Sequence, residues 1–115
     1  MKLKSTLFGA FAVCASSACS AGDGASGVDK GLQCAAMISA ADRLIAEQEL
    51  PKDDLIREKG LIALMTYLAA YAIPKDLPEP QAFAELGTER DRLMSELDAG
   101  KILAKARTCV ERARL

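Results

Sequence analysis

Two of the four cysteines, Cys34 and Cys109, lie on segments whose apolar residues recur at helical spacing. In each segment the charged residues mostly fall off the apolar stripe, so the cysteine belongs to the buried face of its helix. Two inward-facing cysteines, on the first and last predicted helices, are what a disulfide between these helices requires. The apolar positions that accompany them are Met37, Ile38, Ala41, Leu44 and Ile45 for the first, and Ile102, Leu103, Ala106, Val110 and Ala113 for the second.

The N-terminus has the order of a secretory signal peptide. Lys2 and Lys4 form a basic start, residues 7–15 are apolar or small and uncharged, and further small residues follow. The apolar run is far shorter than the ~20 residues that a membrane-spanning helix needs. We therefore predict a signal peptide over residues 1–21, a flexible tether over 22–29 and a helical domain over 30–115, located in the periplasm. The alternative for the first residues is a buried N-terminal helix of the fold.

The cleavage region allows more than one interpretation. Cleavage after Ser20 and cleavage after Ala21 both leave small residues at the required positions. Small residues also precede Cys19 as they do in a lipoprotein signal, although Ser16 stands where leucine is usual. Soluble export is the preferred interpretation. Lipidation of Cys19, which would make the protein a membrane-anchored lipoprotein, is the alternative.

Both cleavage routes leave the same pair of thiols. Cys14 leaves with the signal peptide, and Cys19 is either removed or bonded to lipid. Cys34 and Cys109 then form an even pair in an oxidising compartment, so we predict a disulfide between them. The bridge closes most of the mature chain and stabilises it by about 4 kcal/mol in the chain-entropy model. A redox dithiol is not expected, because the pair lacks C-x-x-C spacing.

Residues 22–27 spell G-x-G-x-x-G, the pattern of a dinucleotide-binding turn. That turn functions only where a strand leads into it and a helix follows to hold the pyrophosphate. Here the preceding residues belong to the predicted signal peptide. We therefore interpret this stretch as part of the tether and expect no cofactor.

Residues 61–73 are all apolar except Thr66. Such a segment predicts a helix at the centre of a bundle, because it has no polar stripe to turn toward water. The alternative is an exposed docking face for a partner, with Tyr67 and Tyr71 stacked one turn apart. Thirteen helical residues extend only ~20 Å, which is too short to span a bilayer.

Helical patterns dominate the remaining chain, and no stretch alternates as a strand would. The prolines of IPKDLPEPQ predict a break, after which a helix resumes at Pro80 or Gln81 and runs to Leu97, with Gly87 as a weak point. Asp98 is placed to cap the last helix. We predict an all-α bundle of about four helices, stapled by one disulfide between the first and last. The helix after the break is expected to bury Phe83, Leu86, Leu93, Met94 and Leu97.

The residue types needed for most catalysis are missing. The chain has no histidine, which removes the commonest general base and most zinc ligand sets. Glu85 and Glu89 are one helical turn apart, but we expect them to lie on a solvated face. We predict a non-enzymatic protein with no catalytic residue, cofactor or metal ion.

The net charge and the positions of the basic residues limit the classes of partner that we expect for this protein. Removing Lys2 and Lys4 takes the formal net charge from −1 to −3, which argues against nucleic acid. A basic cluster near the C-terminus is balanced only by Glu111 and is expected to complement the helix dipole. Anionic lipid or an acidic partner is the alternative. The cluster consists of Lys101, Lys105, Arg107, Arg112 and Arg114.

These observations favour a small exported protein of the cell envelope that binds another, unidentified protein, as an inhibitor or immunity-type module does. One alternative is a lipid-anchored structural lipoprotein. In size, helical class and cysteine number the chain is also similar to small one-disulfide periplasmic helical proteins such as acid-stress chaperones. In that alternative, protonated carboxylates loosen the fold and expose residues 61–73, and without histidine the change occurs near pH 4.

Overall fold

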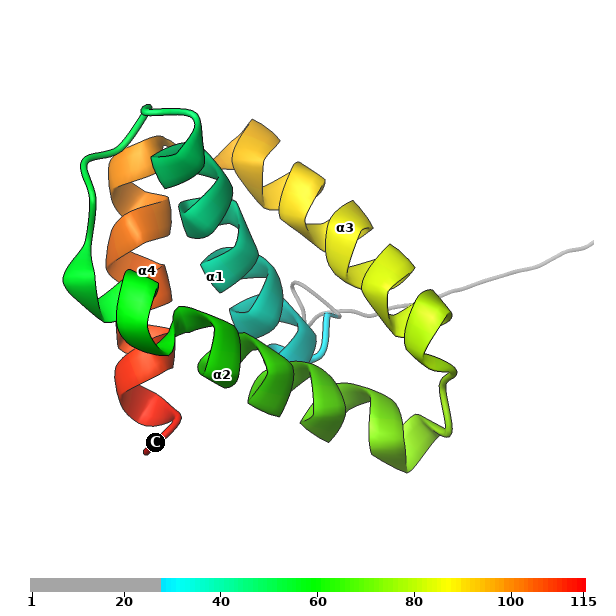
Figure 1. Ribbon diagram of the computed structural model, residues 1–115. Helices are drawn as coiled ribbons and strands as arrows, with labels where there is room; N and C mark the ends of the chain where they lie inside the picture. Colours follow the sequence, from blue (N-terminus) through cyan, green and yellow to red (C-terminus); the bar gives the residue numbers. More distant parts are fainter. Residues whose placement is uncertain (1–27) are drawn as a thin grey trace, which may run out of the picture.

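A computed structural model of the chain describes residues 28–115, and within this range the protein is an all-α bundle (Figure 1). Its elements are α1 (Lys30–Ala46), α2 (Asp54–Ala72), a single 3₁₀ turn η3 (Ile73–Lys75), α3 (Glu79–Glu96) and α4 (Ala99–Arg112). The predicted fold class is confirmed. The predicted signal peptide, the tether up to residue 27 and Cys19 lie outside the described residues. None of the helices between residues 28 and 115 combines the length and apolar character needed to cross a membrane.

Aspartate side chains fix the starts of three helices. Asp29, Asp53 and Asp98 each accept a hydrogen bond from a backbone N–H in the first turn, at 2.7, 3.0 and 2.9 Å respectively. These bonds satisfy donors that the start of a helix leaves free. The predicted cap at Asp98 is confirmed. Asp29, which we assigned to the tether, is instead part of the folded domain, and Val28 before it packs against the core.

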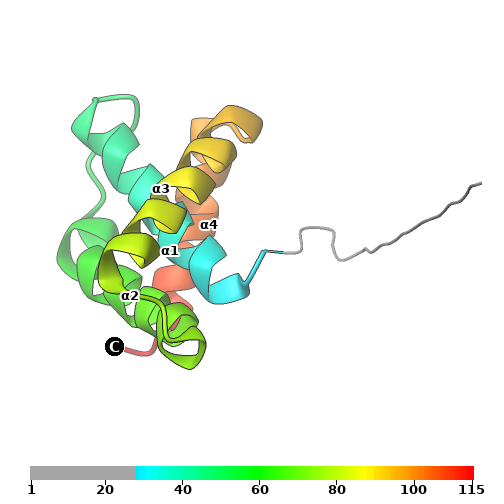
Figure 2. The same cartoon turned by 90° about the vertical axis from the view of Figure 1, so that its right-hand side faces the viewer.

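The centre of the bundle is α1, with α3 and α4 on either side of it and α2 crossing it (Figure 1). The turned view shows α3 in front of α1 and α4 behind it (Figure 2). Short side chains at the buried positions of α1 let the neighbouring helices approach its backbone closely. The most completely buried of these positions are Ala35, Ala36, Ala40 and Ala41.

The prediction that residues 61–73 form a helix at the centre of the bundle is therefore only half right. One face of this helix is buried, as predicted, but the other is exposed to solvent. α2 buries Ala63, Leu64 and Leu68 against the core, but its opposite face remains exposed. The reason is that α1 already occupies the centre, so α2 lies at the outside of the bundle with neighbours on one side only.

The predicted break between α2 and α3 is confirmed. Pro74 lies in η3, Asp76 adopts a left-handed conformation with φ of 54°, and Pro78 immediately precedes the first residue of α3. From there α3 continues to Glu96 without interruption at Gly87.

Among the apolar residues predicted to be buried by the helix after the break, burial differs from the prediction at one position. Leu86 and Leu93 are in the core and Met94 and Leu97 pack at its edge, as predicted, but Phe83 is exposed. The buried stripe of α3 passes through position 82 and returns at 86, 89 and 93. Phe83 stands one residue, or about 100° of helical rotation, away from that stripe.

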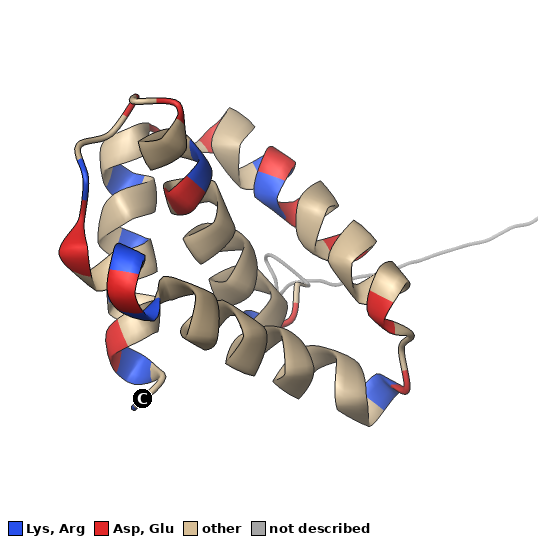
Figure 3. Ribbon diagram, viewed as in Figure 1, with Lys and Arg blue, Asp and Glu red and all other residues tan. Residues whose placement is uncertain are grey.

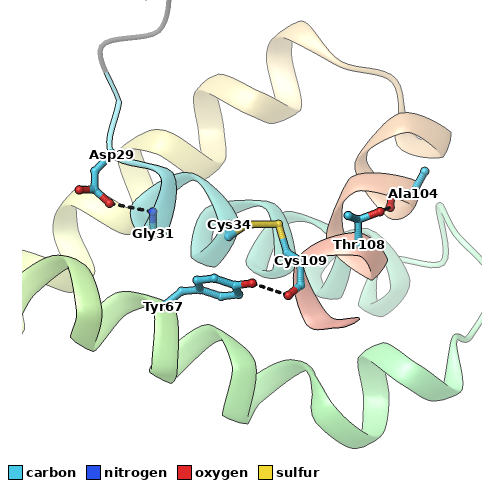
Figure 4. Close-up of a disulfide and its surroundings, with 7 residues drawn as sticks. All are labelled: Asp29, Gly31, Cys34, Tyr67, Ala104, Thr108 and Cys109. Carbon is cyan, nitrogen blue, oxygen red and sulfur yellow. Dashed lines mark hydrogen bonds between the residues drawn. A yellow bond between two sulfur atoms is a disulfide. The ribbon is translucent and has the colours of Figure 1, made fainter. Parts of the chain in front are cut away.

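The predicted disulfide joins α1 to α4. Cys34 and Cys109 have a Cα–Cα distance of 5.6 Å and are 75 residues apart in the sequence. At the same point the Tyr67 hydroxyl donates a hydrogen bond to the backbone carbonyl of Cys109, which connects α2 to α4 (Figure 4). The first, second and last helices are thus fixed to one another at one location.

Candidate protein-binding surface

α2, continued by the first residue of η3, presents a continuous apolar surface to solvent, which we call the outer face. Its four bulky members, Leu61, Ile62, Met65 and Ile73, are 72, 59, 39 and 74% exposed. They follow one another at helical spacing and therefore form one stripe along the helix. The outer face consists of Leu61, Ile62, Met65, Thr66, Ala69, Ala70 and Ile73.

Charged side chains stop at the two ends of this face. None occurs between Lys59 and Lys75, and the corresponding ribbon of α2 is uniformly tan in Figure 3. Single exposed apolar residues are normal, but contiguous apolar patches mark interaction surfaces. Burying one such side chain fully would stabilise a contact by about 1.5–3 kcal/mol. The outer face can therefore contribute binding free energy to a complex with an apolar surface.

The two tyrosines proposed for partner binding do not belong to the outer face. Tyr71 is buried and Tyr67 is partly buried, and each hydroxyl is used inside the fold. Tyr67 donates to Cys109 O on α4, and Tyr71 donates to Glu85 on α3. The Lys75 ammonium lies 4.4 Å from the centre of the Tyr71 ring, as in a cation–π contact. The tyrosines are thus not displayed side by side, and they connect α2 to its neighbours.

The bond between Tyr71 and Glu85 changes the acidity of both groups. The hydrogen bond to Glu85, followed by burial, raises the pKa of Tyr71 to about 12. The same hydrogen bond, followed by one from the Gln81 side chain at 3.2 Å, lowers the pKa of Glu85. Both shifts favour a neutral phenol that donates to an ionised carboxylate at neutral pH.

The expectation that Glu85 and Glu89 lie on a solvated face is wrong for Glu89, whereas Glu85 remains partly exposed. Glu89 is only 6% exposed, and its carboxylate accepts two hydrogen bonds from Arg92, at 2.9 and 2.5 Å. Arg92 also donates to Glu96 at 2.7 Å. Glu89 falls on the buried stripe of α3, and the arginine one turn later supplies the charge that burial of a carboxylate requires. The three-residue spacing between Glu89 and Arg92 was the sequence signal from which this ion pair could have been predicted.

The residues of the basic C-terminal cluster have different surroundings in the structure. Arg107 forms an ion pair with Asp53, the cap of α2. Burial tends to raise the pKa of Asp53, but hydrogen bonds from the Ile56 N–H and from Arg107 outweigh it and leave that pKa lowered. Arg112 lies in the last turn of α4, where a cation complements the helix dipole as expected.

The described residues offer little for other kinds of chemistry. Between residues 28 and 115 there is no cluster of three or more cysteine, aspartate or glutamate side chains that could hold a metal ion. Glu85 and Glu89, the only carboxylate pair singled out in the sequence, are both engaged in bonds within the fold.

Comparison of the chain with protein-family models, with curated proteins and with solved structures finds no match.

Proposed function

We propose that this protein is an exported, non-enzymatic binding module of the cell envelope, and that it contacts a partner protein through the outer face of α2. Export is inferred from the basic start and apolar run of residues 1–21. A disulfide between the first and last helices suits an oxidising compartment. An inhibitor or immunity-type role fits a small stapled domain of this kind.

The observation that carries this proposal is the exposure of Leu61, Ile62 and Ile73 on one helix face. These side chains do not support the fold from where they lie, because the core is completed by the opposite face of α2. Interfaces commonly bury a central apolar cluster surrounded by polar residues. Here the charged residues at both ends of the outer face, Lys59 and Lys75, would form part of that rim.

The test uses the tagged protein expressed with its own N-terminus in its native host. Partners are cross-linked in intact cells, identified, and then purified for direct binding measurements. We expect Ile62→Glu to weaken binding of the identified partner at least tenfold, since it places an unpaired charge in an apolar contact. The measurement is calorimetry with the purified pair.

Leu115→Glu is the matched control, because it also replaces an exposed aliphatic side chain with glutamate, but outside α2. It should leave the affinity within about twofold, as for surface changes away from an interface. Circular dichroism should show the same helix content in both variants. A partner that binds the Ile62→Glu variant as tightly as the wild type would contradict the proposal.

A second candidate function, the acid-responsive chaperone, is favoured by the carboxylates that join helices. Asp53 links α2 to Arg107 of α4, and Glu85 links α3 to Tyr71 of α2. Their folded-state pKa values are below the ordinary ones. Each therefore contributes stability at pH above about 4, and the contribution disappears as the pH falls through the lowered folded-state pKa. Apolar residues on the inner face of α2 would then become accessible.

Near-UV circular dichroism and binding of a hydrophobic dye at pH 7 and pH 3 test this alternative. The chaperone role predicts loss of the tyrosine signal and new dye binding at pH 3, reversed on neutralisation. An unchanged near-UV spectrum without added dye binding at pH 3 would eliminate it.

Anchoring through Cys19 is the remaining alternative and is independent of the binding surface. The intact mass of the protein from its host distinguishes the two forms. A mass that starts at Cys19 with attached acyl chains indicates an anchored lipoprotein. A mass that starts near Gly22, and that rises by two hydrogens on reduction, indicates a free periplasmic protein.

A further inference from the structure

A groove runs between α3 and α4 over the first half of α1. α3 and α4 leave the corner formed by their connecting loop and diverge on either side of α1, and they scarcely contact each other (Figure 1). The resulting open groove has a volume of about 940 Å³. Its apolar lining includes Met37, Leu93 and Leu97, and the disulfide lies among these residues.

The rim of the groove is basic. Lys30 of α1 and Lys105 and Arg112 of α4 line it, and all three side chains are exposed. None of the three forms an ion pair with another residue of the range 28–115. The one acidic residue in the lining, Glu96, is already paired with Arg92 at 2.7 Å. The groove therefore carries a surplus of positive charge around an apolar floor.

The α4 wall also leaves room for an approaching backbone. The residues of α4 that line the groove beside its two cations include Ala104 and Thr108, both small. The Thr108 hydroxyl donates to the Ala104 carbonyl at 3.1 Å, so its polar group is satisfied within the helix (Figure 4). A partner that packs against this wall would bury the Thr108 hydroxyl with its hydrogen bond intact, so no unsatisfied polar group would result.

The two cations of α4 have a spacing that suits a helical partner. Lys105 and Arg112 are seven residues, or two turns, apart, which is roughly 10 Å along the helix axis. Carboxylates seven residues apart on another helix would have the same spacing. Helices commonly bind by laying an apolar stripe into a groove, with charges on either side of the stripe.

We propose that this groove binds an acidic amphipathic helix of a partner protein, with its apolar stripe on the floor and its carboxylates facing Lys30, Lys105 and Arg112. This site is separate from the outer face of α2, none of whose residues line the groove. The inference goes beyond the proposed function, because the groove can bind such a helix whether or not the outer face binds anything.

The test uses two synthetic 18-residue peptides that share one leucine stripe and differ only in their flanking residues, glutamate in one and lysine in the other. Fluorescence anisotropy with the oxidised full chain is measured at low and high salt. We expect the glutamate peptide to bind at least tenfold more tightly than the lysine peptide, and the difference to shrink in high salt. Equal affinity for the two peptides would overturn the proposal.

Charge reversal locates the site. The double variant Lys105→Glu with Arg112→Glu should weaken binding of the glutamate peptide at least tenfold, and both positions are exposed, so the fold should persist. Lys101→Glu with Arg114→Glu is the matched control, because both residues are exposed and lie outside the groove lining. It should change the affinity less than twofold. An equal loss in the control would mean a general charge effect and would overturn the proposal.

Two further measurements separate this site from the other surfaces. Ile62→Glu on the outer face should leave peptide binding unchanged, and loss of binding in that variant would move the site to α2 and overturn the proposal. Vesicles of phosphatidylglycerol should not compete with the peptide. Competition that depends on Lys105 and Arg112 would assign the groove to anionic lipid and would equally overturn it.

Discussion

α1 and α2 are the two most apolar helices of the domain, but they occupy different places in it. α1 buries alanines on several sides and contacts all the other helices, whereas α2 carries larger side chains and buries only one face. A helix with small side chains can accept several close neighbours, because each neighbour approaches its backbone. Apolar content alone therefore does not decide which helix is central. The apolar side chains of α2 that do not pack in the core form a surface that is available for binding.

Opening the disulfide should have the largest effect on this arrangement, because it frees α1 from α4. We expect the Cys34→Ser and Cys109→Ser double variant to lose about 4 kcal/mol of unfolding free energy in the chain-entropy model. Urea denaturation of the oxidised protein and the variant measures the difference. A loss below 1 kcal/mol would mean that packing around α1 holds the helices without the bridge.

Shortening a buried side chain of α1 should have the next largest effect. Ile38 is 1% exposed, so Ile38→Ala should destabilise the protein by about 2–5 kcal/mol through lost burial and the cavity left behind. Thermal and urea denaturation measure this loss of unfolding free energy. A value near zero would contradict the central position of α1.

Tyr71→Phe should give a smaller loss of about 1 kcal/mol, as expected for one hydrogen bond, because the ring stays and only the hydroxyl is removed. The pKa of Glu85 should rise, since its hydrogen bond from Tyr71 is lost. Glu85 should therefore contribute less to the stability of the variant at neutral pH, and the variant should lose less stability than the wild type as the pH falls below about 4. A carboxyl NMR titration of both proteins measures the shift, and an unmoved Glu85 resonance would argue against this contact.

Ile62→Ala should have the smallest effect on stability, because Ile62 is on the outer face of α2. We expect a change within about 0.5 kcal/mol, against the several kcal/mol for the same substitution at Ile38. Urea denaturation of the two isoleucine variants side by side gives the comparison. A loss above 2 kcal/mol at Ile62 would show that the outer face supports the fold and would remove the basis for binding there.

Much of the fold was predictable from local sequence signals. The cap at Asp98, the proline-rich break before α3 and the inward cysteines each depend on neighbouring residues, so the pattern was sufficient for them. The position of a helix among its neighbours was not predictable in this way. Periodicity tells which face turns inward, but it does not tell how many other helices that face will meet.

The candidate site was predictable only in part. Residues 61–73 were recognised as unusually apolar, but a run with no polar stripe gives no sign of which residues face solvent. The tyrosines attracted attention by their type, whereas Leu61 and Ile73 are the residues that lie exposed. Phe83 and Glu89 were misplaced because the buried stripe on α3 accepts a paired carboxylate and omits an aromatic ring.

The disulfide also determines how the domain would respond to a mechanical load. Because Cys34 and Cys109 lie close to the two ends of the folded domain, they enclose a covalent loop that contains all of α2 and α3. A pull applied between the ends of the domain would pass through the sulfur atoms and bypass the enclosed residues. Only the short segments outside the loop could extend, so the outer face of α2 would keep its shape under tension for as long as the bridge remains oxidised.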